Sequence, residues 1–139
     1  MAKRRAYLFG AFFFLILVVL LAGCSSKPSD KRARADLQKW FDSRWPSTIQ
    51  VIEYEAVTKE RNGRKYVLEY RAKGQFIKDT FGCVPTCCGD VCFDKLVDGM
   101  RWITKASDNP HDIRKGDLFE TRGKNTYTKT VMGWLRENS

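Results

Sequence analysis

The sequence predicts an α+β domain in which an N-terminal amphipathic helix packs on a curved antiparallel sheet of about four to six strands. Three observations support this fold class. Residues 31–44 have helical periodicity, residues 48–73 alternate between polar and apolar side chains around Asn62-Gly63, and residues 100–135 contain only strand and turn patterns. A cluster of cysteines between these parts predicts a disulfide-stapled loop insertion.

The helix is expected over residues 31–44, capped by Ser29 or Asp30 and stopped by Pro46. Apolar residues recur there at spacings of three and four, which is typical of one buried stripe on a charged helix. The stripe consists of Ala33, Leu37, Trp40, Phe41 and Trp45.

A long hairpin should follow, with strands over residues 48–59 and 64–73. Asn62-Gly63 is expected to supply two positive φ angles at its turn. Gly74 is expected to mark a bulge before the strand continues over residues 75–78. The predicted core-facing residues of the hairpin are Ile52, Tyr54, Ala56, Tyr66, Leu68, Tyr70 and Ala72.

The C-terminal part predicts a strand over residues 100–104, a loop over residues 108–116 and a second hairpin. In that hairpin, strands 118–122 and 126–130 flank a turn at Gly123-Lys124-Asn125. Gly133-Trp134-Leu135 closes the domain.

The first residues are typical of a secretory signal. Lys3, Arg4 and Arg5 precede an uncharged apolar run over residues 6–21, and small residues follow. An uncleaved membrane helix over residues 6–23 is the alternative, and it would also place the remainder of the chain outside the cytoplasm.

Leu21-Ala22-Gly23-Cys24 resembles the lipobox of bacterial lipoproteins at all four positions. The resemblance implies cleavage between Gly23 and Cys24 and attachment of acyl chains, such as palmitate, to Cys24. Residues 1–23 would then be the signal peptide, residues 24–29 a tether and residues 30–139 a single domain. Ser25, where lipoproteins of the inner membrane have Asp, implies an outer-membrane anchor that faces the periplasm.

Residues 31–78 and 116–134 resemble small NTF2-like or cystatin-like domains of exported lipoproteins. The residues that match the end of this pattern are Tyr127, Lys129, Thr130, Gly133 and Trp134. The resemblance implies accessory roles in envelope or secretion assemblies, and a helix–sheet pocket that some relatives use for ligands or catalysis.

Four cysteines remain once Cys24 is lipidated, and an oxidising compartment predicts two disulfides among Cys83, Cys87, Cys88 and Cys92. We favour Cys83–Cys88 with Cys87–Cys92, because crossed links would compact the loop. Cys83–Cys87 with Cys88–Cys92 stays open. Cys83–Cys92 with Cys87–Cys88 ranks last, since adjacent cysteines need a strained peptide. Export and the close spacing disfavour a zinc site.

Removing the signal leaves 116 residues with 22 Lys and Arg against 16 Asp and Glu. This charge suits anionic lipid, cell-wall polymer or an acidic envelope partner, whereas export and the absence of a binding motif argue against nucleic acid. The lone histidine, His111, lies between Asp108 and Asp112 in a polar loop and is expected to be solvated.

The sequence therefore predicts a non-catalytic, membrane-anchored envelope lipoprotein that acts as an interaction or assembly module, without metal or cofactor. Two alternatives remain. One is a small-ligand-binding or enzymatic NTF2-like domain, and the other is an inhibitor or immunity-type module that acts through the loop between Cys83 and Cys92. The exposed edges of that loop, namely Phe81, Val84, Pro85, Val91 and Phe93, are the candidate recognition surface.

Overall fold

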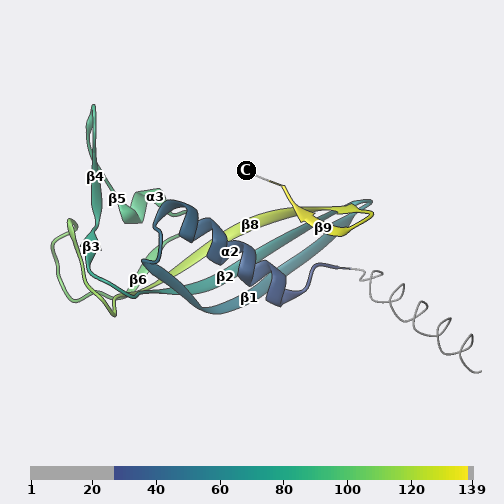
Figure 1. Ribbon diagram of the computed structural model, residues 1–139, viewed down its shortest axis with the longest axis horizontal. Coiled ribbons are helices and arrows are strands. Elements are labelled where there is room, and N and C mark those ends of the chain that lie inside the picture. Colours follow the sequence, from purple (N-terminus) through teal and green to yellow (C-terminus); the bar gives the residue numbers. More distant parts are fainter. Residues whose placement is uncertain (1–26, 138–139) are drawn as a thin grey trace, which may run out of the picture.

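A five-stranded antiparallel sheet with helix α2 across one face forms the body of the domain (Figure 1). The computed structural model describes residues 27–137. The predicted α+β class is confirmed. In chain order the elements are α2 (Asp30–Arg44), β1 (Ile49–Asn62), β2 (Lys65–Phe76), β3 (Thr80–Phe81), β4 (Cys83–Thr86), β5 (Gly89–Cys92), α3 (Phe93–Leu96), β6 (Arg101–Thr104), β7 (Asp112–Ile113), β8 (Leu118–Thr130) and β9 (Gly133–Arg136).

Strand β8 is the centre of the sheet. It pairs with β2 along one edge, and with both β6 and β9 along the other, so the path reads β1-β2-β8-β6 with β9 beside β8. The β2–β8 register runs from Lys65 opposite Thr128 to Gln75 opposite Leu118. Two small sheets, β3–β7 and β4–β5, lie outside this main sheet.

Helix α2 forms where the sequence predicted it. The Ser29 side chain caps it by accepting a hydrogen bond from the Arg32 backbone N–H at 3.2 Å. Its buried stripe is Ala33, Leu37 and Phe41, while Trp40 and Trp45 are partly buried against the same core. The helix ends at Arg44, as expected from Pro46 two residues later.

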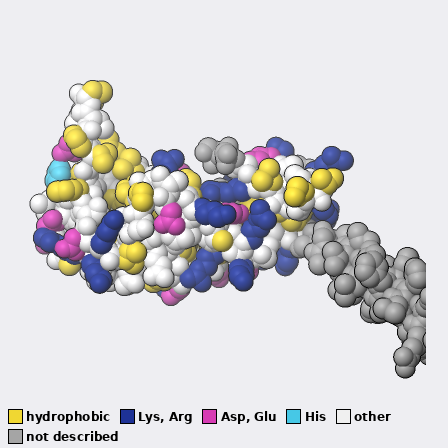
Figure 2. All heavy atoms as spheres, in the orientation of Figure 1, with side chains coloured by type: hydrophobic (Ala, Val, Ile, Leu, Met, Phe, Trp, Pro, Cys, Tyr) yellow, Lys and Arg dark blue, Asp and Glu magenta, His cyan; other side chains and the backbone are white. Residues whose placement is uncertain are grey.

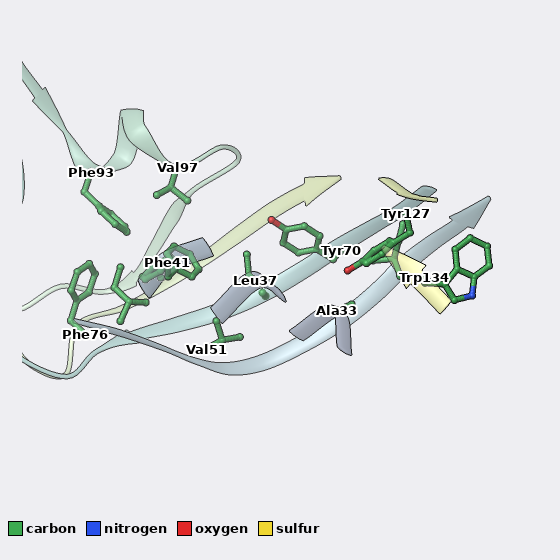
Figure 3. Close-up of a cluster of buried hydrophobic side chains, with 14 of the residues drawn as sticks. Ala33, Leu37, Phe41, Val51, Tyr70, Phe76, Phe93, Val97, Tyr127 and Trp134 are labelled. Carbon is green, nitrogen blue, oxygen red and sulfur yellow. The ribbon is translucent and has the colours of Figure 1, made fainter. Parts of the chain in front are cut away.

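The core lies between α2 and the concave face of the sheet, and Figure 3 shows its side chains. The alternation predicted for β2 is confirmed, but the prediction for β1 was wrong at one position. Val51 is buried, whereas Ile52 is only partly so, because a bulge between Val51 and Glu53 resets the alternation. The core residues are Ala33, Leu37, Phe41, Ile49, Val51, Tyr66, Leu68, Tyr70, Ala72, Phe76, Phe93, Val97, Ile113, Phe119, Tyr127 and Trp134.

The predicted C-terminal hairpin at Gly123 was wrong. Residues 118–130 form one continuous strand, β8, and Gly123 lies in its middle opposite Tyr70. A Cβ at Gly123 would lie 2.5 Å from the Tyr70 hydroxyl, so the glycine makes room for the tyrosine ring. The turn that does follow β8 is at Val131-Met132, between Thr130 and Gly133.

The first hairpin is confirmed, although two of its details differ. Asn62 is the last residue of β1 and pairs with Lys65, so only Gly63, at φ 60°, has a positive φ in this turn. Gly74 is no bulge on β2. It stands where a Cβ would lie 2.3 Å from the Phe119 ring, and the bulge is on the facing strand β1.

The predicted signal peptide, Gly23 and Cys24 lie outside the described residues. Pro28, which the sequence assigned to the tether, is buried against the domain. Within residues 27–137, no helix has the length and apolar character to cross a membrane.

Candidate functional site

The hairpin formed by β4 and β5, residues 83–92, carries the cysteine cluster and is called the cysteine hairpin below. It stands away from the main sheet, at the end of the molecule opposite the start of the described chain (Figure 1). Its register pairs Cys83 with Cys92 and Thr86 with Gly89. Cys87 and Cys88 are therefore the two residues of its turn.

A disulfide joins Cys83 to Cys92 at the base of the cysteine hairpin. The favoured pairing, Cys83–Cys88 with Cys87–Cys92, was therefore wrong, and so was the alternative of Cys83–Cys87 with Cys88–Cys92. The physical reason is strand register. Antiparallel pairing brings the Cα atoms of Cys83 and Cys92 within 3.8 Å, whereas the crossed links would require partners at opposite ends of the hairpin.

At the tip, Cys87 and Cys88 are exposed free thiols. Their Sγ atoms lie 3.2 Å apart, and the Cys88 backbone N–H points to Thr86 Oγ1 at 3.4 Å. The structure thus contains one disulfide where two were predicted, and that disulfide belongs to the pairing ranked last. The tip displays a pair of thiols where the sequence predicted oxidised cysteines.

The apolar edge predicted for recognition is only partly available. Phe81 is 86% exposed, and Val84 and Pro85 are exposed as well. Phe93 was wrongly included, because it is buried in the core. Its ring contacts the rings of Trp45, Phe76, Trp102 and Phe119. Val91 is half-buried, so the surface is formed by Phe81, Val84 and Pro85.

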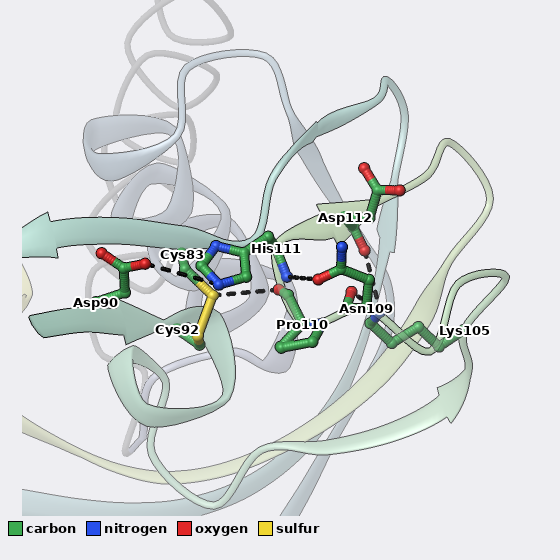
Figure 4. The surroundings of a disulfide bond; sticks show 8 residues. All are labelled: Cys83, Asp90, Cys92, Lys105, Asn109, Pro110, His111 and Asp112. Carbon is green, nitrogen blue, oxygen red and sulfur yellow. Dashed lines mark hydrogen bonds and ion pairs between the residues drawn. A yellow bond between two sulfur atoms is a disulfide. The ribbon is translucent and has the colours of Figure 1, made fainter.

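The single histidine lies beside strand β5 of the cysteine hairpin. His111 Nε2 lies 3.6 Å from Asp90 Oδ2 on β5, and both side chains are about half exposed (Figure 4). The neighbouring Pro110 carbonyl oxygen lies 3.3 Å from Cys83 Sγ, a contact rather than a hydrogen bond because a disulfide sulfur carries no proton. The predicted neighbours Asp108 and Asp112 do not form an ion pair with His111.

A second candidate site is a cavity of about 100 Å³ beneath helix α2. Leu37, Trp40 and Phe41 line it from the helix, while Asn125 and Arg136 line it from β8 and β9. Asn125 is 3% exposed, and its Nδ2 has no hydrogen-bond partner among the described residues. Sequence reasoning missed this residue because it assigned Asn125 to a solvated turn.

Three tyrosines on the same face keep their protons at neutral pH. Burial raises the pKa of Tyr54, Tyr70 and Tyr127, and Asp36 contributes to the rise at Tyr127. Tyr127 donates a hydrogen bond to Asp36 Oδ2 at 3.1 Å. Tyr54 stacks on Tyr70, with 5.4 Å between ring centroids, but its hydroxyl has no partner in the described part of the chain.

Two parts of the domain present groups that could contact a partner or a ligand. The cysteine hairpin offers an apolar edge and two thiols, and the cavity is lined by Arg136 and by the unpaired Nδ2 of Asn125. Across residues 27–137, no three His, Cys, Asp or Glu side chains are grouped so as to hold a metal ion. No family model, curated protein or solved structure matches this chain.

Proposed function

We propose that the protein is a non-catalytic lipoprotein of the bacterial cell envelope, anchored to the outer membrane through Cys24 and facing the periplasm. Its domain presents the cysteine hairpin to another envelope protein. The proposal combines the lipobox at residues 21–24 with the position of the hairpin in the fold.

One observation carries the proposal. The cysteine hairpin projects from the end of the domain that is farthest from Lys27, where the described chain begins (Figure 1). A short hairpin is marginally stable alone, so a disulfide at its base holds it in one conformation. Phe81 and Val84 are left exposed beside it. A rigid, apolar loop on a scaffold is a common form of protein-binding site.

Site-specific photo-crosslinking in intact cells tests this function. A photoreactive residue is placed at Val84 and, as the matched control, at Val57, which is 57% exposed in the middle of β1. We expect a discrete adduct with one envelope protein from position 84 and none from position 57. Equal adducts from both positions, or none from either, would contradict the proposal. An adduct with a secreted enzyme or toxin would favour the inhibitor role.

The anchor has a test of its own. Cys24→Ser should leave an unprocessed precursor without lipid, since the lipobox cysteine carries the acyl group. Mass spectrometry of the membrane fraction distinguishes this precursor from the processed, acylated chain. Normal processing of the variant would argue against the lipoprotein assignment.

The cavity beneath α2 favours a second candidate function, the binding of a small polar molecule. Its support is Asn125 Nδ2, a buried donor without a partner, next to Arg136. Such a donor destabilises an empty site by about 1–3 kcal/mol. Native mass spectrometry of the purified chain should then detect a co-purifying small molecule that Asn125→Leu loses. If the purified protein has only the mass of its own chain and Asn125→Leu is more stable than the unsubstituted protein, this function is ruled out.

A further inference from the structure

One end of the domain gathers three segments that are distant in the sequence, and it is called the basic end below. Lys59 Nζ on β1 lies 3.6 Å from Asp30 Oδ1 at the start of α2. The Lys129 backbone N–H on β8 donates to the Arg64 carbonyl at 2.8 Å. The basic end therefore comprises the start of α2, the β1–β2 turn and the β8–β9 turn, as Figure 1 shows.

The β8–β9 turn presents two apolar side chains to solvent. Val131 is 105% and Met132 is 93% exposed, and Leu135 on β9 is 60% exposed. The turn itself requires only Gly133, whose φ is 109°. The fold does not account for two apolar residues at this tip, because neither packs against the core.

Basic side chains surround this apolar tip. Arg61, Arg64 and Lys65 are exposed on the adjacent β1–β2 turn. Of the nearby acids, Asp30 is paired with Lys59 and Glu137 with Lys65, while Glu60 is exposed next to Arg61. The basic end thus has a positive excess around an apolar point, and Figure 2 shows Lys and Arg side chains together with hydrophobic ones at this end.

Chain length ties the basic end to the proposed anchor. Pro28 is buried against the domain, and Cys24 precedes it by four residues. Four residues span at most about 13 Å even when fully extended. A lipidated Cys24 therefore holds Pro28, two residues before α2, within about 13 Å of the bilayer, on the side of the domain where the basic end lies.

We propose that the basic end is a membrane-contact surface for an anionic phospholipid bilayer. Val131 and Met132 enter the interfacial region, and Arg61, Arg64 and Lys65 face the headgroups. Apolar side chains next to Lys and Arg suit the acyl–headgroup boundary of such a membrane. This inference rests on the proposed lipid anchor. Contact through the basic end adds a second attachment point beside the acyl anchor. Two attachment points fix the orientation of the domain on the membrane, with the cysteine hairpin directed away from the bilayer.

Methionine methyl NMR tests the contact in the complete, processed protein. The chain has three methionines, and Met1 leaves with the signal peptide, so ¹³C-methyl labelling should give two signals, from Met100 and Met132. The protein is placed in nanodiscs that contain phosphatidylglycerol. We expect a spin label on the lipid acyl chains to broaden Met132 several-fold more than Met100, which is partly buried in the core. A water-soluble gadolinium chelate should spare Met132.

Charge variants separate the headgroup contact from general electrostatics. Arg61→Gln with Arg64→Gln removes two charges from the basic end, whereas the control, Lys95→Gln with Lys115→Gln, removes two exposed charges elsewhere. We expect the first pair to weaken the lipid-induced broadening of Met132 at least twofold, and the control pair to leave it unchanged.

The membrane contact and the lipid anchor would be contradicted by different NMR results. A processed, acylated protein whose Met132 is broadened by the aqueous chelate and not by the lipid label would overturn the membrane contact and leave the anchor intact. Concentration-dependent shielding of Met132 without lipid would assign the tip to self-association and also overturn it. A third methionine signal, from retained Met1, would instead contradict processing at Cys24 and hence the proposed function.

Discussion

The two ends of the molecule are both tight antiparallel hairpins, but they are stabilised in different ways. The turn between β8 and β9 extends a five-stranded sheet, and Trp134 beside it packs on Tyr66 with 5.7 Å between ring centroids. The cysteine hairpin has four-residue strands that pair only with each other, and a disulfide closes its base. A hairpin that shares a core needs no crosslink, whereas one that leaves the core does.

Removing the core contact at the basic end should have the largest effect. Trp134 is 6% exposed, so Trp134→Ala should lower the free energy of unfolding by about 3–5 kcal/mol. Urea denaturation measures the loss. Phe81→Ala, at an exposed aromatic residue near the cysteine hairpin, is the control and should change the free energy by less than about 0.5 kcal/mol.

Removing the disulfide should have a smaller and local effect. Cys83→Ala with Cys92→Ala opens a loop whose closure is worth about 2–3 kcal/mol in the chain-entropy model. Hydrogen exchange should show lost protection in β4 and β5, with β2 and β8 unchanged. Equal loss in both regions would show that the cysteine hairpin is part of the main cooperative unit, and the comparison of the two ends would fail.

Substituting the exposed tip of the basic end should hardly affect folding. Val131→Ser with Met132→Ser should change the free energy of unfolding by less than about 0.5 kcal/mol, because both side chains are exposed. Thermal unfolding without lipid measures this. A decrease in the free energy of unfolding of more than about 1 kcal/mol would show that Val131 and Met132 stabilise the fold. Their exposure would then have a structural reason, which would argue against the membrane contact.

Thiol chemistry should distinguish the tip of the cysteine hairpin from its base, with no effect on stability. Maleimide labelling of the folded, processed protein should modify Cys87 and Cys88, which are exposed thiols, and leave Cys83 and Cys92 unmodified. Peptide mass spectrometry locates the labels. An absence of labels would show that no thiol is free, as the sequence prediction of two disulfides requires.

Local patterns along the chain predicted much of the fold. Ser29, the stripe of Ala33, Leu37 and Phe41, and Pro46 each act within a few residues, so α2 was predicted with nearly correct ends. The alternation of buried and more exposed side chains along β2 was predicted equally well, because it depends only on neighbouring residues. The glycines were misread where their reason is a partner far along the chain, as with Gly123 beneath Tyr70 and Gly74 beside Phe119.

The candidate sites were less predictable for the same reason. Disulfide pairing depends on strand register, and the register of β4 and β5 is set by their turn rather than by cysteine spacing. Asn125 became a buried, unpaired donor only because β8 runs on through the expected turn. Val131 and Met132 became a candidate contact surface only because β8 pairs with β2, which brings their turn next to the basic β1–β2 turn.

The sequence by itself determined the α+β class, the helix and the first hairpin, because each depends on periodicity or on a motif of a few adjacent residues. The tertiary structure alone decided which cysteines pair, which aromatic residues are buried, and that the two hairpins point to opposite ends of the domain. Those properties depend on contacts between residues far apart in the chain, such as Tyr70 with Gly123, which no local pattern encodes.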